Sequence, residues 1–312
     1  MAKKNIRDKR KQDLIFYVVM LAIPMLQFAI FYIGVNFNSF LLMFQKFDST
    51  ATDPWKRFVF LDGANIFSNF GKVIETIKDS NFKHLLTNSL ISYVVSLVAG
   101  TGFAIIFSYY VYKKFPLHGL VKVVLFAPSI ISGVVLAQTY NEFVNGVIQK
   151  LYNTISGETQ EILISKYGTS TTFGLVLFYC IWVGFGGSIL LYVGAMNNIP
   201  ESVSEACQLD GANLFQELIY IVFPLIYPTF VTFMVVGVGG IFTNQMALYG
   251  FFGDGAASSL QTFGYYLFHQ TKNAGFKDYP KVATMGLMMT AIAAPLTFLI
   301  KWLLEKYGPT TE

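Results

Sequence analysis

The chain has 312 residues, of which 54% are hydrophobic, 17% are aromatic and only 13% are charged. About a quarter of the residues of a soluble domain are charged, so this composition excludes an ordinary soluble protein and indicates an integral membrane protein. The formal net charge of +4 is small, and Lys and Arg cluster beside apolar runs rather than forming a face for nucleic acid. The two cysteines, Cys180 and Cys207, support neither a disulfide framework nor a cysteine metal site.

The N-terminus resembles a signal peptide only superficially. Residues 1–13 are basic, and they precede an apolar run over residues 14–37. That run is longer than the apolar core of a typical signal peptide, and no small-residue cleavage site follows it, so we expect a retained membrane anchor. Because basic residues favour the cytoplasmic side, residues 1–13 are predicted to be cytoplasmic.

Apolar runs long enough to cross a membrane recur along the chain. A spanning helix needs about 20 predominantly apolar residues. Six runs qualify, and they cover residues 14–37, 85–112, 123–140, 172–196, 219–242 and 282–300. We therefore predict an all-α integral membrane protein with six transmembrane helices. The last five helices would form a core over residues 85–304, and an even count returns a tail, residues 305–312, to the cytoplasm.

The connecting segments fit this topology. Residues 38–84 carry charges of both signs among recurring Phe, Ile and Trp, which predicts a small folded segment outside the membrane. Residues 141–171, with a turn at Gly157-Glu158, and residues 243–280 are also predicted to be external. The short basic connection between the second and third spans is predicted to be internal.

The polar segment between the fourth and fifth spans, residues 199–228, has unusual charge. It contains Glu201, Glu205, Asp210 and Glu217, and no Lys or Arg occurs between Lys166 and Lys272. Cytoplasmic loops of membrane proteins normally carry excess positive charge. An acidic loop on that side suggests a basic protein partner.

Two short helices are predicted in this segment. Pro200 suits a first helical position, and Gly211, after Asp210, supplies a left-handed exit from the first helix. Asn213 with Gln216 three residues later is typical of a cap for a second helix. Pro224 would bend or end that second helix.

A family resemblance follows from these residues. Glu205-Ala206-Cys207, Gly211, Ile221 and Phe223-Pro224 follow the pattern EAA-x3-G-x9-I-x-L-P, with Cys207 and Phe223 replacing Ala and Leu. The pattern resembles the EAA loop of binding-protein-dependent ABC importer permeases. The flanking residues 181–182, 191–194, 199–200 and 210–212 resemble the sugar (maltose-type) branch. An ordinary interfacial pair of amphipathic helices is the alternative interpretation.

The resemblance implies a type I importer fold in a prokaryotic cell membrane, with coupling helices that dock on an ATPase. It implies a second permease subunit, usually forming a heterodimer, two ATPase subunits and an extracytoplasmic binding protein that docks on the external segments. Glu205 would pair with a basic residue in a cleft of the ATPase. The implied ATPase-coupling residues are Glu205, Ala206, Cys207, Asp210, Gly211, Ala212, Ile221 and Pro224.

The sequence offers no energy source within the chain. No Asp, Glu, Lys, Arg or His lies inside the six predicted spans, which argues against a proton relay. Gly71-Lys72 lacks the rest of a nucleotide-binding loop. We expect a non-enzymatic subunit without cofactor or metal, with ATP and Mg bound by the partner ATPase.

Uncharged polar and aromatic residues near the ends of spans are candidates for a substrate path, because sugars are neutral and rich in hydroxyl groups. They are Gln138, Tyr140, Asn141, Tyr179, Trp182, Asn244 and Gln245. Contacts between helices and an aromatic belt at the membrane surface explain such residues equally well. Close helix packing likewise explains Gly237, Gly239 and Gly240 as well as a path does.

The leading hypothesis is a permease subunit of an ATP-driven importer of a carbohydrate, with an oligosaccharide as the expected cargo. The alternative is a secondary, ion-coupled carrier of a small neutral solute. Helix breaks at Pro224 and Pro228 would be compatible with this alternative, because backbone carbonyl groups at broken helices can bind a coupling ion. A membrane-embedded enzyme would need convergent titratable groups, and the sequence does not indicate them. The sequence does not identify the sugar.

Overall fold

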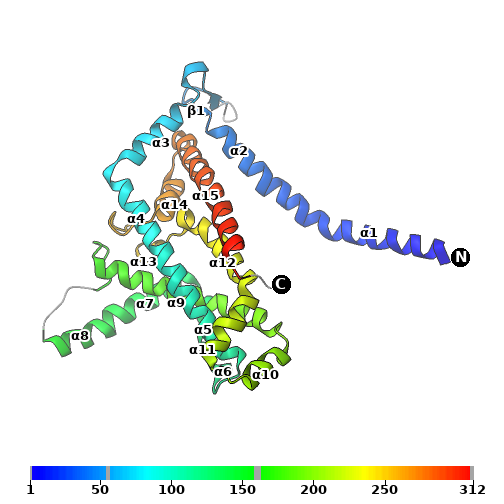
Figure 1. The fold of residues 1–312 in the computed structure, drawn as a ribbon. Coiled ribbons are helices and arrows are strands. Elements are labelled where there is room, and N and C mark those ends of the chain that lie inside the picture. The colour runs from blue at the N-terminus through cyan, green and yellow to red at the C-terminus, as the bar shows by residue number, and fades with distance from the viewer. Residues whose placement is uncertain (1, 54–56, 158–162, 310–312) are drawn as a thin grey trace. The chain divides into compact units, whose positions relative to one another are not determined.

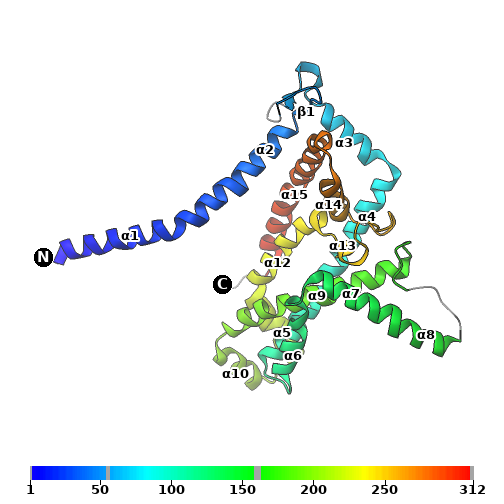
Figure 2. The ribbon, with the colours of Figure 1, turned by 180° about the vertical axis from the view of Figure 1, so that it is seen from behind.

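The computed structural model describes residues 2–53, 57–157 and 163–309, and these residues are mostly helical (Figure 1; Figure 2). The chain divides into two compact units. The first comprises Met1–Thr76 and Ala274–Met288, and the second comprises Ile77–Asn273 and Met289–Glu312. Helix α15 (Tyr279–Tyr307) begins in the first unit and continues in the second.

The first unit starts with a long apolar helix built from α1 (Ala2–Gln27), a π-helical segment (Phe28–Gly34) and α2 (Val35–Leu42). The part from Lys11 to Leu42 is long and apolar enough to span a membrane, and it contains the predicted span over residues 14–37. Its apolar side chains are exposed within the described part of the chain, as expected of a helix whose surroundings are lipid.

A small folded element follows this helix. Strands β1 (Gln45–Phe47) and β2 (Phe58–Phe60) pair antiparallel, with Lys46 opposite Val59. A 3-10 turn (Gly63–Asn65) and helix α3 (Ser68–Lys78) come next. The buried Asn69 amide of α3 donates to the carbonyl oxygens of Met43 and Gln45 at 3.0 and 2.8 Å. These contacts give residues 43–53 and 57–78 a defined structure, and their position outside the membrane stays a prediction.

The second unit contains most of the long apolar helices. In it, α4 (Ser80–Val95), a π-helical segment (Ser96–Gly100) and α5 (Thr101–Tyr112) form one candidate span. Helix α9 (Ser170–Asn197) forms another. Two further candidate spans cover Leu214–Phe252, which includes α12 (Phe223–Thr243) and α13 (Leu248–Phe252), and Phe276–Tyr307. With the N-terminal helix, the described residues thus hold five straight candidate spans, at five of the six predicted positions.

The third predicted span, residues 123–140, is not one continuous helix, because a break divides it. Helix α6 (His118–Phe126) passes into a 3-10 turn (Ala127–Ser129), and the chain resumes as α7 (Gly133–Phe143). A π-helical segment (Val144–Ile148) and α8 (Gln149–Ser156) follow, and the two halves differ in direction by 105°. Pro128 causes part of this break, because it lacks an amide hydrogen and disturbs the preceding turn. Helix α8 also extends into the segment that was predicted to be polar and external.

Gly157 ends α8 with φ +69°, in agreement with the predicted turn, whereas Glu158 lies outside the described residues. Helix α9 then forms the centre of the second unit. It contributes buried residues to two apolar clusters, one around Tyr179 and one around Ile189. Its Gly186 lies directly against the backbone of α6, at the carbonyl group of Leu125.

Replacing Gly186 with alanine is expected to destabilise the protein by about 1–3 kcal/mol, because the new methyl group would overlap the Leu125 carbonyl oxygen. Gly184→Ala is the matched control, since a methyl group there meets nothing within 4 Å and alanine favours a helix over glycine. Thermal unfolding of the purified protein in detergent would measure both effects. Equal midpoints for the two variants would contradict the predicted overlap.

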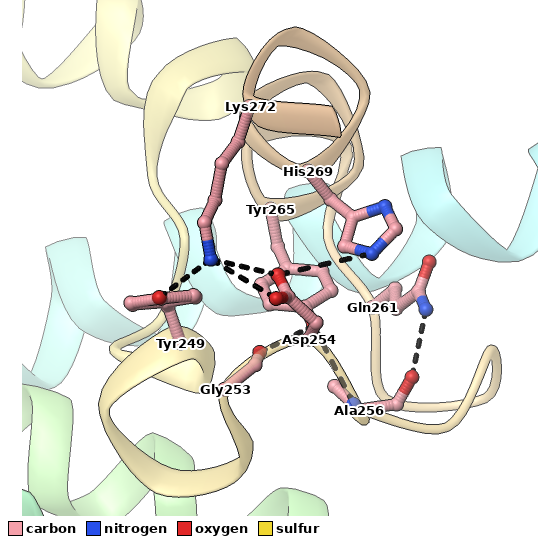
Figure 3. A network of polar contacts seen from close by, with 8 residues as sticks. All are labelled: Tyr249, Gly253, Asp254, Ala256, Gln261, Tyr265, His269 and Lys272. Atoms are coloured by element: carbon pink, nitrogen blue, oxygen red, sulfur yellow. Dashed lines mark hydrogen bonds and ion pairs between the residues drawn. The ribbon is translucent and has the colours of Figure 1, made fainter. Parts of the chain in front are cut away.

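The segment after α12 is ordered by a polar network that includes α14 (Phe263–Asn273) (Figure 3). Lys272 Nζ donates to Asp254 Oδ2 at 3.0 Å and to the Tyr249 hydroxyl at 2.6 Å, and His269 Nε2 lies 3.9 Å from Asp254 Oδ1. The hydrogen bond and positive charge of Lys272 lower the pKa of Asp254 below its ordinary value. Tyr265 donates to the Gly253 carbonyl oxygen at 2.7 Å. Part of the predicted external segment 243–280 is therefore a defined structure.

Candidate functional site

The predicted pair of short helices is present in residues 199–224. Helix α10 (Glu201–Leu209) starts one residue later than predicted, because Pro200 is its N-cap rather than its first residue. Gly211 has φ +76°, a conformation that side chains disfavour, and it turns the chain towards helix α11 (Leu214–Glu217). The predicted cap of α11 is confirmed: Gln216 N donates to Asn213 Oδ1 at 3.0 Å, and Asn213 N donates to Gln216 Oε1 at 2.8 Å.

Pro224 does not end the second helix, which continues from α11 through a π-helical segment (Leu218–Val222) into α12. A proline ring inside a regular helix collides with the carbonyl group four residues before it. The wider π-helical turn directly before Pro224 accommodates the ring and the missing amide hydrogen. Helix α11 is therefore joined to the fifth span without an interruption.

Six of the eight predicted ATPase-coupling residues gather around one open groove. The groove is lined by Ser202, Val203, Ala206, Cys207, Asp210, Gly211, Ala212, Gln216, Tyr220 and Ile221. Glu205 is exposed on α10 but does not line the groove, and Pro224 lies further along the chain. The helix–turn–helix thus presents a concave surface, and the exposed carboxylate of Glu205 lies on α10 beside it.

The surface around this groove combines negative charge with exposed apolar side chains. Glu201, Glu205 and Asp210 are exposed. Leu209 and Phe215 expose 88% and 75% of their surface, far more than a residue packed in its own domain. Acidic residues and large apolar side chains exposed together are typical of a docking surface for another protein.

Glu217 differs from the other acidic residues because only 2% of it is exposed. Its Oε1 lies 2.9 Å from Lys113 Nζ and accepts a hydrogen bond from Ser204 Oγ at 2.8 Å. Its Oε2 accepts a hydrogen bond from the Tyr109 hydroxyl at 3.0 Å. Lys113 Nζ also donates to Ser204 Oγ at 3.0 Å, so both charges are paired and hydrogen-bonded.

The sequence interpretation placed Lys113 and Glu217 in separate loops and missed this ion pair. One signal was available, because Glu217 lies three residues after Leu214 and four before Ile221, so it shares a helix face with two apolar residues. A carboxylate at such a position requires a partner when it is buried.

Three of the predicted substrate-path residues form one aromatic cluster with Phe251. The ring centroids of Tyr140 and Tyr179 are 5.2 Å apart, and that of Trp182 lies 6.4 Å from Tyr140. The hydroxyl groups of Tyr140 and Tyr179 donate to the carbonyl oxygens of Leu175 and Gly133, each at 3.2 Å. These contacts join α7, α9 and α13, so the cluster stabilises helix packing.

The amide residues among the predicted set have contacts within the chain. Gln138 Nε2 donates to the Gly250 carbonyl oxygen at 2.5 Å, and Asn141 Oδ1 accepts from Asn145 Nδ2 at 3.0 Å. Asn244 Oδ1 accepts from the Met246 amide at 2.8 Å. The carbonyl oxygen of Gln245 accepts from the Leu248 amide at 3.0 Å.

Asn244 has a second role, because it lines a cavity of about 260 Å³ between α4–α5, α9 and α12. Small and hydroxyl-bearing residues dominate the wall. The lining residues are Tyr93, Ser96, Leu97, Gly100, Thr101, Ala104, Cys180, Ile181, Gly184, Phe185, Ser188, Tyr192, Phe233, Met234, Gly237, Gly240 and Asn244. The Tyr192 hydroxyl is buried and has no hydrogen-bond partner among the described residues. The sequence interpretation singled out three of these residues, Asn244, Gly237 and Gly240.

Several permease proteins of ABC transporters are similar to this chain in sequence. The "Probable ABC transporter permease protein YurN" of Bacillus subtilis is 26% identical over 278 residues, which are 86% of this chain and 90% of that protein. The lactose transport system permease protein LacF of Rhizobium radiobacter is 23% identical over 75% of this chain and 79% of its own length. The arabinooligosaccharides transport system permease protein AraP of Halalkalibacterium halodurans is 24% identical over 56% of this chain and 54% of its own length. No model of a protein family matches the chain.

A solved structure shares the fold. The crystal structure of a bacterial ABC transporter involved in the import of the acidic polysaccharide alginate contains a chain that aligns with a TM-score of 0.74 and 18% identity, over 97% of this chain and 99% of that chain. The same transporter in complex with its alginate pentasaccharide-bound periplasmic protein aligns with a TM-score of 0.73. The resemblance drawn from the EAA pattern is confirmed: the chain is related over most of its length to permease subunits of ABC transporters, carbohydrate transporters among them.

Proposed function

We propose that this chain is the transmembrane permease subunit of an ATP-driven importer of a carbohydrate, most simply an oligosaccharide, delivered by an extracytoplasmic binding protein. One observation carries the proposal. A helix–turn–helix with an exposed Glu205 and a groove lined by Ala206, Cys207 and Gly211 stands between two candidate spans of a chain related to sugar permeases.

The proposal includes partner subunits that bind and hydrolyse ATP and that complete the substrate path. Two ATPase subunits with ATP and Mg would bind the groove and Glu205, and a second permease, expected to be a different chain, would complete the path. The ordered network at Asp254 and Lys272 would belong to an external face that meets the binding protein. The membrane is the prokaryotic cell membrane, with both termini in the cytoplasm.

The cavity fits a neutral, hydroxyl-rich cargo. Its polar groups are chiefly hydroxyl and amide groups, including those of Tyr192 and Asn244, and none of the described residues that line it is charged. Hydroxyl and amide groups exchange hydrogen bonds with sugars without requiring a counter-ion. We therefore assign this cavity, rather than the aromatic cluster of Tyr140 and Tyr179, to the substrate path.

The test is reconstitution of the complete complex. The chain would be co-expressed with its neighbouring transporter genes, purified and placed in proteoliposomes with the binding protein and labelled oligosaccharides. We expect ATPase subunits to co-purify with the chain. Uptake should require ATP on the side of the membrane where the ATPase subunits are bound. Uptake that an ion gradient drives without ATP would instead support a secondary carrier.

A further inference from the structure

Three elements meet at the carboxylate of Glu217. Glu217 belongs to α11, Ser204 belongs to α10, and Tyr109 and Lys113 lie at the end of α5. Both views show the end of α5 close to α10 (Figure 1; Figure 2). The contacts are short, with 2.9 Å between Lys113 Nζ and Glu217 Oε1 and 2.8 Å between Ser204 Oγ and the same oxygen.

The three elements are connected to the spans in different ways. Helix α10 follows α9 after three residues, and α11 continues into α12 through a π-helical segment. Helix α5 has no such covalent link to this region, because it ends at Tyr112 and the chain turns away into α6. Its end is held there by side-chain contacts, which include the bonds of Lys113 and Tyr109 to Glu217 and the packing of Tyr109 and Val111 in one apolar cluster with Val222.

Helix α5 also forms one wall of the cavity. Thr101 and Ala104, which lie about three and two and a half helical turns before Lys113, line the cavity opposite residues of α9 and α12. Ser108 Oγ donates to the Ile189 carbonyl oxygen at 3.2 Å, which fastens α5 to α9 between the cavity and the ion pair. A movement of α10 that pulls on Lys113 would therefore move a wall of the cavity.

We propose that Lys113 and Glu217 are positioning residues that transmit the movement of the ATPase-bound helix α10 to the α5 wall of the cavity. This inference rests on the proposed function. Lys113 and Glu217 expose only 12% and 3% of their side chains. Separating two such charges would leave each without a counter-charge in a poorly solvated place, so the pair stays closed through the transport cycle.

The first test uses the whole reconstituted transporter and Glu217→Gln, which removes the charge and preserves the shape. We expect the ATPase to remain bound and to hydrolyse ATP, whereas substrate transported per ATP falls about tenfold, the size of a typical coupling between contacting residues. Lys113→Gln should lower the amount of substrate transported per ATP by a similar factor. The double variant should lower it no further than either single variant. Lys114→Gln, at the neighbouring exposed lysine, is the matched control and should transport normally.

The second test does not depend on a variant of the ion pair. Spin labels at exposed positions 114 and 208, in a background with Cys180 and Cys207 replaced by alanine, report the distance between the end of α5 and α10. We expect the same distance in the nucleotide-free and ATP-bound transporter. The inference is overturned if this distance changes, or if Glu217→Gln transports as much substrate per ATP as the wild-type protein. Neither outcome contradicts the proposed function. A wild-type complex without ATP-driven uptake overturns the proposed function itself.

Discussion

Replacing Glu205 with lysine is expected to abolish ATP-dependent uptake and to release the ATPase subunits from the complex. Glu205 is exposed on α10, beside the groove and two exposed acidic residues, Glu201 and Asp210. If the ATPase presents a basic residue to this surface, the substitution replaces an attraction with a repulsion that costs several kcal/mol. Affinity purification followed by quantification of the ATPase bound per permease measures the loss.

Glu142→Lys is the matched control for this prediction. Glu142 is exposed on α7, away from the coupling groove, and the substitution makes the same change in charge. It should leave the amount of bound ATPase unaltered. An intact complex and undiminished uptake with Glu205→Lys would show that the ATPase docks elsewhere.

Replacing Gly240 with leucine is expected to block the substrate path while the ATPase stays bound. Gly240 lines the cavity, and a Cβ atom there meets nothing within 4 Å, so the leucine side chain can extend into the open volume. We expect uptake to fall at least about tenfold, because forcing a cargo past added atoms costs on the order of 1–3 kcal/mol, as overpacking does elsewhere. Uptake and ATP hydrolysis should be measured on the same proteoliposomes.

Gly239→Leu provides the comparison within the same helix. Gly239 precedes Gly240 on α12, its Cβ would also meet nothing within 4 Å, and it does not line the cavity. The two variants add the same atoms to the same helix, so a difference in uptake reports the cavity alone. If both variants transported sugar like the wild-type protein, the cargo would have to pass outside this cavity.

Long apolar runs predicted most of the helices because length and apolar composition are local properties of the sequence. The break within residues 123–140 was not predicted, because apolar composition does not determine the direction of a helix. Pro128 and Gly133 offered a local signal of the break, but proline is also tolerated inside membrane helices, as Pro228 shows in α12. The angle of 105° depends on packing that the sequence pattern does not contain.

The candidate site likewise contains features that neighbouring residues predict and features that depend on packing between distant parts of the chain. The turn at Gly211 and the cap formed by Asn213 were predictable, because backbone conformation and capping depend on neighbouring residues. The pair of Lys113 and Glu217 joins residues that are 104 positions apart, and no local rule selects one partner among many. The cavity is also a product of packing, since three candidate spans contribute to its wall and most of its residues have no distinctive chemistry.

The order of Lys113 and Glu217 along the chain has a consequence for biogenesis. A ribosome synthesises Lys113 more than a hundred residues before Glu217, so the ammonium group is already at the membrane when the carboxylate arrives. We therefore expect the later acidic residue to meet its counter-charge when the continuous helix of α11 and α12 is inserted into the membrane. Exchanging the two residues would keep one charge in place before the other is synthesised. Replacing Lys113 with an uncharged residue would leave the newly made carboxylate without a counter-charge at the membrane.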